Sequence, residues 1–245
     1  MAEKKYRVGI DLGGTNIKAG IVDGDNKLLA TASRPTKSER PWKEIVADMA
    51  ETVKDAAVKA GVTLDECISV GIGNPGVIDP EHGVIVYSNN LGWDDVPLTE
   101  EFTKYIQLPV RVSNDANCAA MGEAAAGAAA GAGDVILLTL GTGVGGGIIL
   151  DNKVYEGGVG GAELGHVTLI AGGRLCTCGR KGCIESYCSA NALIAQANEA
   201  LAKHPESMMA QLVEKEGGMN GKIPFDAAQS GDATGKAVVD QYIEY

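Results

Sequence analysis

The chain has 245 residues, enough for one large domain or two small ones, and 45% of them are hydrophobic, which indicates a globular protein and excludes a disordered one. The formal net charge of −11 argues against nucleic acid or an anionic membrane as a partner. Any bound phosphate must then be held by backbone N–H groups, a metal ion or a few local cations.

The N-terminal part of the chain carries alternating strand and helix signals. Strands are predicted at 6–10, 17–22 and 83–90, and residues 68–79 are predicted to form a strand that runs into a Gly/Pro turn. The glycines after the first strand and the stretch at 23–27 are typical of turns. Residues 40–61 have the spacing of an amphipathic helix that ends at Gly61.

The remaining chain begins with a strand that includes residues 109–113, followed by Asn114 and Asp115 and by an alanine-rich helix that starts near Ala116. A second glycine-rich pair of strands begins at Asp134, and after Ile184 the pattern is helical to the end, with a polar loop at 215–226. Strands that alternate with helices predict an α/β fold.

Two stretches of the chain share one plan. Residues 9–27 and 138–153 each read as an apolar strand, a Gly/Thr turn, a second apolar strand and a turn with Asp and Asn-Lys. Such an internal repeat predicts two related half-domains, each with a glycine-rich hairpin. Chance similarity between two β-hairpins is the alternative.

The two glycine turns are candidate phosphate sites. They consist of Gly13, Gly14 and Thr15, and of Gly141, Thr142 and Gly143. Both lie between strands, so neither fits a dinucleotide fingerprint or a P-loop. Glycines allow successive N–H groups to converge on an anion, and Asp11 could hold Mg²⁺ directly or through water. The alternative is that both are ordinary tight hairpins.

Asn114 and Asp115 lie between a strand and a helix. Both residue types are favoured helix N-caps. The carboxyl end of a strand in an α/β fold is also where ligands bind, and an Asp there can accept the proton of an attacking hydroxyl during phosphoryl transfer. Local sequence alone leaves capping and catalysis open.

A short stretch at 166–183 gathers potential metal ligands. They are His166, Cys176, Cys178 and Cys183. Four such ligands would close a tetrahedral site, so we predict a structural zinc, with simple reduced thiols as the alternative. Glu163 and Glu185 lie close to this loop in sequence and are candidate acceptors for sugar hydroxyls, with solvated surface charges as the alternative.

The sequence also bears on where the protein works. No apolar leader segment precedes the first strand, and the small-residue run at 124–132 is too short to cross a bilayer. We therefore expect a cytoplasmic protein without a membrane partner, in a compartment where thiols stay reduced.

Taken together, the motifs resemble the ROK family of sugar kinases, repressors and related proteins. The resemblance covers residues 7–190 and rests on "DLGGTNIKAGIVD", "GIGNPGVID", "NNLGW", "SNDANCAAMGE", "TLGTGVGGGI", "GGVGGAELGH" and "CTCGRKGCIES". It implies a two-lobed actin/hexokinase/Hsp70-like (ribonuclease H-like) fold with nucleotide and sugar in a central cleft. We expect lobes at 1–115 and 116–245, the second containing the zinc loop.

The resemblance also implies roles for individual residues. Asp115 resembles the catalytic base, and both glycine turns resemble the phosphate clamps for ATP. The implied sugar ligands are Asn90, Asn114, Asp115, Glu163, His166 and Glu185. The loop that contains His166 resembles the zinc site of the family.

The expected activity is ATP-dependent phosphorylation of a hexose, most simply glucose to glucose 6-phosphate, by a homodimer or homotetramer. An N-acetylmannosamine or fructose kinase, or a non-catalytic sugar-binding or sugar-sensing remnant, are the alternatives. A DNA-binding repressor is not expected, because too few residues precede the first strand to form a helix-turn-helix. Nothing after Thr142 matches the second Gly-Gly turn that seats adenosine in the family, so we expect the C-terminal part of the fold to be missing and glucose to bind better than ATP.

Overall fold

The computed structural model describes residues 5–157 and 162–245, which form two compact units. The first unit comprises Met1–Leu137 and Gly147–Ala162, and the second comprises Leu138–Gly146 and Glu163–Tyr245. The first unit thus extends beyond residue 115, because the helix that follows this residue packs against strands of the N-terminal sheet. The division into lobes at 1–115 and 116–245 stays a prediction.

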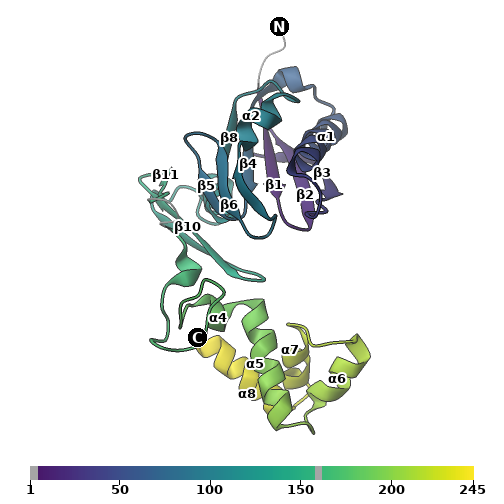
Figure 1. The fold of residues 1–245 in the computed structure, drawn as a ribbon, viewed down its shortest axis with the longest axis vertical. Helices are drawn as coiled ribbons and strands as arrows, with labels where there is room; N and C mark the ends of the chain where they lie inside the picture. Colours follow the sequence, from purple (N-terminus) through teal and green to yellow (C-terminus); the bar gives the residue numbers. More distant parts are fainter. Residues whose placement is uncertain (1–4, 158–161) are drawn as a thin grey trace. The chain divides into compact units, whose positions relative to one another are not determined.

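A five-stranded mixed sheet forms the centre of the first unit (Figure 1). Its order is β3 (Leu28–Pro35), β2 (Asn16–Val22), β1 (Tyr6–Leu12), β4 (Cys67–Asn74) and β8 (Val110–Asn114). β1, β4 and β8 run parallel, whereas β1, β2 and β3 are antiparallel. Parallel strands bring their carboxyl ends to one edge, so Asp11 and Asn114 lie at the same edge of the sheet. The expected α/β class is confirmed.

Helix α1 (Trp42–Ala60) covers one face of this sheet. Its buried side chains Ile45, Met49 and Val53 belong to one apolar core with alternate residues of the strands, such as Ile10 and Ile17. The helix ends where predicted, because Gly61 adopts the left-handed conformation at φ 69° and its N–H bonds the carbonyls of Ala57 and Val58.

The stretch from 67 to 103 begins as predicted, with a strand that runs into a Gly/Pro turn. β4 ends at Asn74, Pro75 and Gly76 follow, and a short further strand, β5 (Val77–Asp79), comes after the turn. β5 pairs with β6 (Val84–Ser88), which pairs with β7 (Trp93–Val96), in a separate antiparallel sheet. Helix α2 (Leu98–Thr103) follows.

The alanine-rich segment forms α3 (Asp115–Ala126). The second glycine hairpin is present as β9 (Val135–Leu140) and β10 (Val144–Leu150), with the short strand β11 (Lys153–Val154) beyond β10. The tip of this hairpin belongs to the second unit, and its base belongs to the first. Both predicted hairpins therefore form.

The rest of the second unit is a loop followed by helices. A 3₁₀ turn, η2 (Leu164–His166), opens the loop. The helices are α4 (Glu185–Cys188), α5 (Ala190–Lys203), α6 (Met208–Glu216), α7 (Ile223–Gln229) and α8 (Ala233–Glu244). α5 to α8 bury a small apolar core that includes Leu193 and Met209. The predicted polar loop is shorter than expected, because the Asn220 side chain accepts the N–H of Ile223 and starts α7.

Within the described ranges, no helix is long and apolar enough to cross a membrane.

Candidate functional site

The turn between β1 and β2 is fixed from outside the hairpin. The N–H of Gly13 bonds the carbonyl of Asn16 at 3.0 Å and closes the turn. Thr36 is fully buried next to this turn. Its hydroxyl donates a hydrogen bond to the carbonyl of Gly13 at 2.6 Å, and its N–H donates one to the carbonyl of Thr15 at 2.9 Å. Sequence reasoning missed Thr36, since a single threonine after a strand carries no signal. The turn is therefore held in one shape.

Gly14 and Asn90 lie against each other. A methyl group added to Gly14 would meet the carbonyl oxygen of Asn90 at 3.0 Å, tighter than an ordinary contact. The structure thus brings a residue predicted to hold phosphate next to one predicted to hold sugar, although they are far apart in the chain. Only a glycine permits this approach without moving the backbone of Asn90.

Asp11 and Asp115 line the same cavity, a hollow of about 860 Å³ on the face of the five-stranded sheet opposite α1. Asp11 lies 3.6 Å from the ammonium of Lys18, its cross-strand neighbour. The Asp115 side chain is accessible from the cavity, yet protein surrounds it on several sides. This partial desolvation raises the pKa of Asp115 above its ordinary value, and the charge of Asp11 raises it further.

The structure separates the two roles that local sequence left open at the start of α3. The N-cap is Asn114: its backbone is extended and its Oδ1 accepts the N–H groups of Ala116 at 2.9 Å and Asn117 at 3.3 Å. Its Nδ2 donates to the carbonyl of Gly76 at 3.2 Å. Asp115 is the first residue of the helix, and its Oδ1 accepts the N–H of Ala116 at 2.9 Å.

We expect Asn114→Ala to lower the free energy of unfolding by about 1 kcal/mol, because the N–H of Asn117 loses its side-chain acceptor and the N–H of Ala116 loses one of two. Asn114→Asp should cost much less, since Asp caps about as well as Asn. Urea unfolding followed by circular dichroism measures both variants. Equal losses for Ala and Asp would contradict the capping role.

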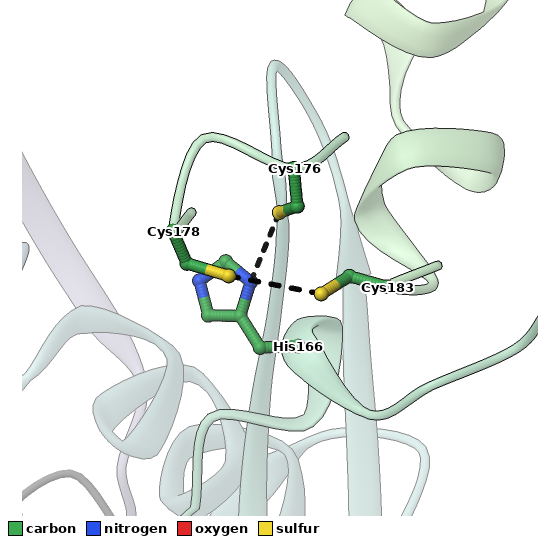
Figure 2. Close-up of side chains that lie close together, drawn as sticks. All are labelled: His166, Cys176, Cys178 and Cys183. Atoms are coloured by element: carbon green, nitrogen blue, oxygen red, sulfur yellow. Dashed lines mark hydrogen bonds between the residues drawn. The ribbon is translucent and has the colours of Figure 1, made fainter. Parts of the chain in front are cut away.

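The four predicted metal ligands converge in the second unit (Figure 2). Nδ1 of His166 lies 3.5 Å from Sγ of Cys176, and Sγ of Cys178 lies 3.7 Å from Sγ of Cys183. All four ligand atoms lie within 4.8 Å of one another, so this group could hold a metal ion.

The loop folds this way because its two arms pair with each other. Short antiparallel bridges join Thr168 to Cys183 and Leu175 to Lys181. Gly182 is required at the crossing: its φ is 87°, and a methyl group there would lie 1.8 Å from the carbonyl of Ile170. The N–H of Arg180 stabilises the thiolate of Cys178 and lowers its pKa to about 6.

Glu185 connects this loop to the second glycine turn. Its Oε2 accepts the N–H of Val144 at 3.0 Å, and its Oε1 accepts the hydroxyl of Thr177 at 3.0 Å. Sequence reasoning proposed Glu185 but missed both partners, because contacts of this kind depend on tertiary structure. Glu163 is exposed and precedes η2, in which the N–H of His166 bonds the carbonyl of Glu163 at 3.0 Å.

The predicted site residues divide between the two units. The first unit holds Asp11, Gly13, Gly14, Thr15, Asn90, Asn114 and Asp115. The second unit holds Gly141, Thr142, Gly143, Glu163, His166, Cys176, Cys178, Cys183 and Glu185. Within each unit the structure brings residues distant in sequence together.

Comparison with known proteins shows the family to which the chain belongs. The family model described as "ROK family" matches residues 7–245. A glucokinase of Halalkalibacterium halodurans is 37% identical over 247 residues, which cover all of this chain and 74% of that protein.

Two solved structures are similar along nearly the whole chain. A ROK family glucokinase from Streptomyces griseus, in complex with glucose and AMPPNP, is 36% identical with a TM-score of 0.78, over 97% of this chain and 75% of that one. A ROK hexokinase from Thermus thermophilus is 35% identical with a TM-score of 0.80, over 97% and 73% of the two chains. Both are consistent with the actin/hexokinase-like fold. The chain belongs to the ROK family.

Proposed function

We propose that the protein is an ATP-dependent hexokinase whose substrate is glucose and whose product is glucose 6-phosphate. The observation that carries this proposal is the agreement between the whole-chain similarity to glucokinases and the position of Asp115 at the sheet edge. In the relative from Streptomyces griseus the same fold binds glucose and a nucleotide analogue.

Asp115 is the proposed general base. It receives the proton of the sugar hydroxyl as the hydroxyl oxygen attacks the γ-phosphorus, and the β–γ bridging oxygen leaves with ADP. Two observations support this role: Asn114 supplies the helix cap, and the pKa of Asp115 is raised, which makes its carboxylate a stronger base. Because Asp115 lines the cavity, a substrate in the cavity can reach its carboxylate.

The glycine turns are the proposed phosphate clamps. Gly13, Gly14 and Thr15 present a turn held rigid by Thr36, and Gly141, Thr142 and Gly143 present the second. Rigid backbone N–H groups stabilise transferring charge without reorganisation. Asp11 offers the oxygen ligand that Mg²⁺ prefers and is the proposed residue for that ion, which would neutralise phosphate charge.

The proposed sugar ligands are Asn90, Asn114, Asp115, Glu163, His166 and Glu185. Carboxylate, amide and imidazole groups can each bond sugar hydroxyls. The side chain of Asn114 already has partners inside the protein, but its amide has remaining hydrogen-bonding capacity.

The metal of the Cys/His cluster is proposed to be a structural zinc. Tetrahedral zinc, with Zn–S bonds of about 2.3 Å and Zn–N of about 2.0 Å, separates two sulfurs by about 3.8 Å and a sulfur from a nitrogen by about 3.6 Å. The corresponding distances here, 3.7 Å and 3.5 Å, fit this geometry. Cys176, Cys178, Cys183 and Nδ1 of His166 would complete four-coordination, so the ion stabilises the loop.

The proposal also covers the cellular compartment and the oligomeric state of the protein. The six cysteines, all within the described residues, form no disulfide, which fits a reducing compartment, and we propose the cytoplasm. A homodimer or homotetramer is proposed from the resemblance to the family alone.

A coupled ADP-release assay over glucose, N-acetylmannosamine, fructose and mannose tests the function. We expect the highest kcat/KM with glucose. A clear preference for N-acetylmannosamine or fructose would move the protein to another kinase of the family. ADP release that no hexose stimulates, together with intact glucose binding, would identify a sugar-binding protein without catalysis.

The activity should also depend on pH through Asp115. Because a general base must be ionised and its pKa is raised, we expect the acidic limb of the kcat/KM profile to lie above the ordinary Asp pKa of about 3.9. Activity then falls as the pH drops through the raised pKa. A profile that stays flat down to about pH 4 would contradict this.

A further inference from the structure

One carboxylate lies between the Cys/His cluster and the tip of the β9–β10 hairpin. Glu185 accepts the N–H of Val144 with one oxygen and the hydroxyl of Thr177 with the other, both at 3.0 Å. Thr177 is the residue between Cys176 and Cys178, and Val144 follows the glycine turn directly. All of these residues belong to the second unit. Glu185 therefore touches both elements at once.

The glycine turn is shaped around this carboxylate. A methyl group on Gly143 would lie 2.4 Å from Oε2 of Glu185, whereas a methyl group on Gly141 would meet nothing within 4 Å. Gly143 does not have a positive φ, so its backbone conformation suits any residue. A side chain at 143 would therefore displace the carboxylate end of the Glu185 side chain. The carbonyl of Gly141 also accepts the N–H of Ala190 at 2.9 Å, which ties the turn to the start of α5.

The position of the carboxylate depends in turn on the cluster. Glu185 follows the buried Cys183 by two residues and is the first residue of α4. Its Oε1 lies 3.8 Å from Sγ of Cys176. A carboxylate offers about four acceptor positions, so these contacts leave capacity for a sugar hydroxyl. Any shift of the cysteine loop moves both oxygens relative to the turn.

We propose that Glu185 is a positioning residue that couples the metal cluster to the 141–143 glycine turn. A bound metal holds the turn in the shape that meets the nucleotide phosphates, and an intact turn helps to retain the metal. Coupling of this kind is reciprocal by thermodynamic necessity. The inference rests on the proposed zinc site and phosphate clamp and adds the connection between them.

The first test perturbs the turn and measures the metal. Zinc-loaded Gly143→Ala is expected to release zinc to a chromogenic chelator at least about threefold faster than the unchanged protein, although residue 143 is no ligand. Gly141→Ala is the matched control, with the same substitution in the same turn but open space for the methyl group. It should release zinc at the unchanged rate.

The second test perturbs the carboxylate and measures the turn. In zinc-loaded protein labelled with ¹⁵N-valine, Glu185→Ala is expected to speed amide hydrogen exchange at Val144 at least about tenfold. Val213 in α6 and Val238 in α8 report on opening of the whole unit and should be unchanged. Glu185→Gln keeps one acceptor oxygen and should restore most of the protection at Val144.

Both measurements are made without sugar or nucleotide, so an inactive kinase would leave their interpretation intact. Equal zinc release from the two glycine variants would overturn the proposal. So would unchanged exchange at Val144 in Glu185→Ala, even if that variant bound glucose weakly, because Glu185 would then be a sugar ligand alone. Protein purified without zinc would also overturn it.

Discussion

Asp115→Asn is expected to lower kcat by at least about a hundredfold while glucose still binds. The substitution keeps the shape of the side chain but removes the proton acceptor, and loss of a general base typically costs about 10²–10⁴-fold. The interaction that is lost matters chiefly in the transition state, so KM for glucose should change little. Steady-state kinetics with glucose and ATP measures both parameters.

The stability of this variant separates catalysis from capping. Burial raises the pKa of Asp115 in the folded state, so folding favours its protonated form, and this contribution is lost as the pH rises through the raised pKa. At neutral pH the ionised carboxylate is therefore unfavourable, and Asn should leave Tm unchanged or slightly higher. Asp151→Asn, on the β10–β11 turn, is the control and should keep normal kcat. Normal kcat in Asp115→Asn would contradict the role of Asp115 as the general base.

Cys176→Ala/Cys178→Ala is expected to abolish metal binding. The unchanged protein should contain close to one zinc per chain by elemental analysis, and the double variant none, because two ligands cannot complete a tetrahedral site. Glucose affinity should fall at least about tenfold, since His166 is proposed for both the metal and the sugar. Calorimetry measures this loss.

Cys188→Ala is the matched control for the cysteine variants. Cys188 belongs to the same unit but lies outside the cluster, so its loss should leave zinc content and glucose affinity unchanged. Full zinc content in the double variant would exclude the cluster as the metal site. Zinc loss with unchanged glucose affinity would separate the metal from the sugar pocket.

The fold was predictable where local signals agree. Gly61 ends α1 as predicted, and both glycine hairpins form, because turn residues and strand patterns coincide there. β3 was missed because its burial pattern has little regular alternation, and it is held by pairing with β2. The helix predicted through the alanine-rich run ends at Ala126, because the side chain of Glu123 accepts the N–H of Ala128 beyond Gly127.

The candidate site was predictable as a set of residues but not as a set of contacts. The ligand types around Cys176 are enough to predict the cluster, since few other arrangements need them. Asn114 and Asp115 are equally good caps in sequence, and only the extended backbone of Asn114 assigns the cap to it. The pairing of Glu185 with Val144 spans 41 residues and depends on the folded loop.

The division of the chain into units bears on protein engineering. The chain enters the second unit at Leu138, leaves it after Gly146 and re-enters it at Glu163. A chimera that exchanges only residues 163–245 between two relatives would combine the carboxylate of Glu185 from one parent with the turn at Val144 from the other. Recombination should therefore transfer both segments together, or the partners of this hydrogen bond will come from sequences that never evolved side by side.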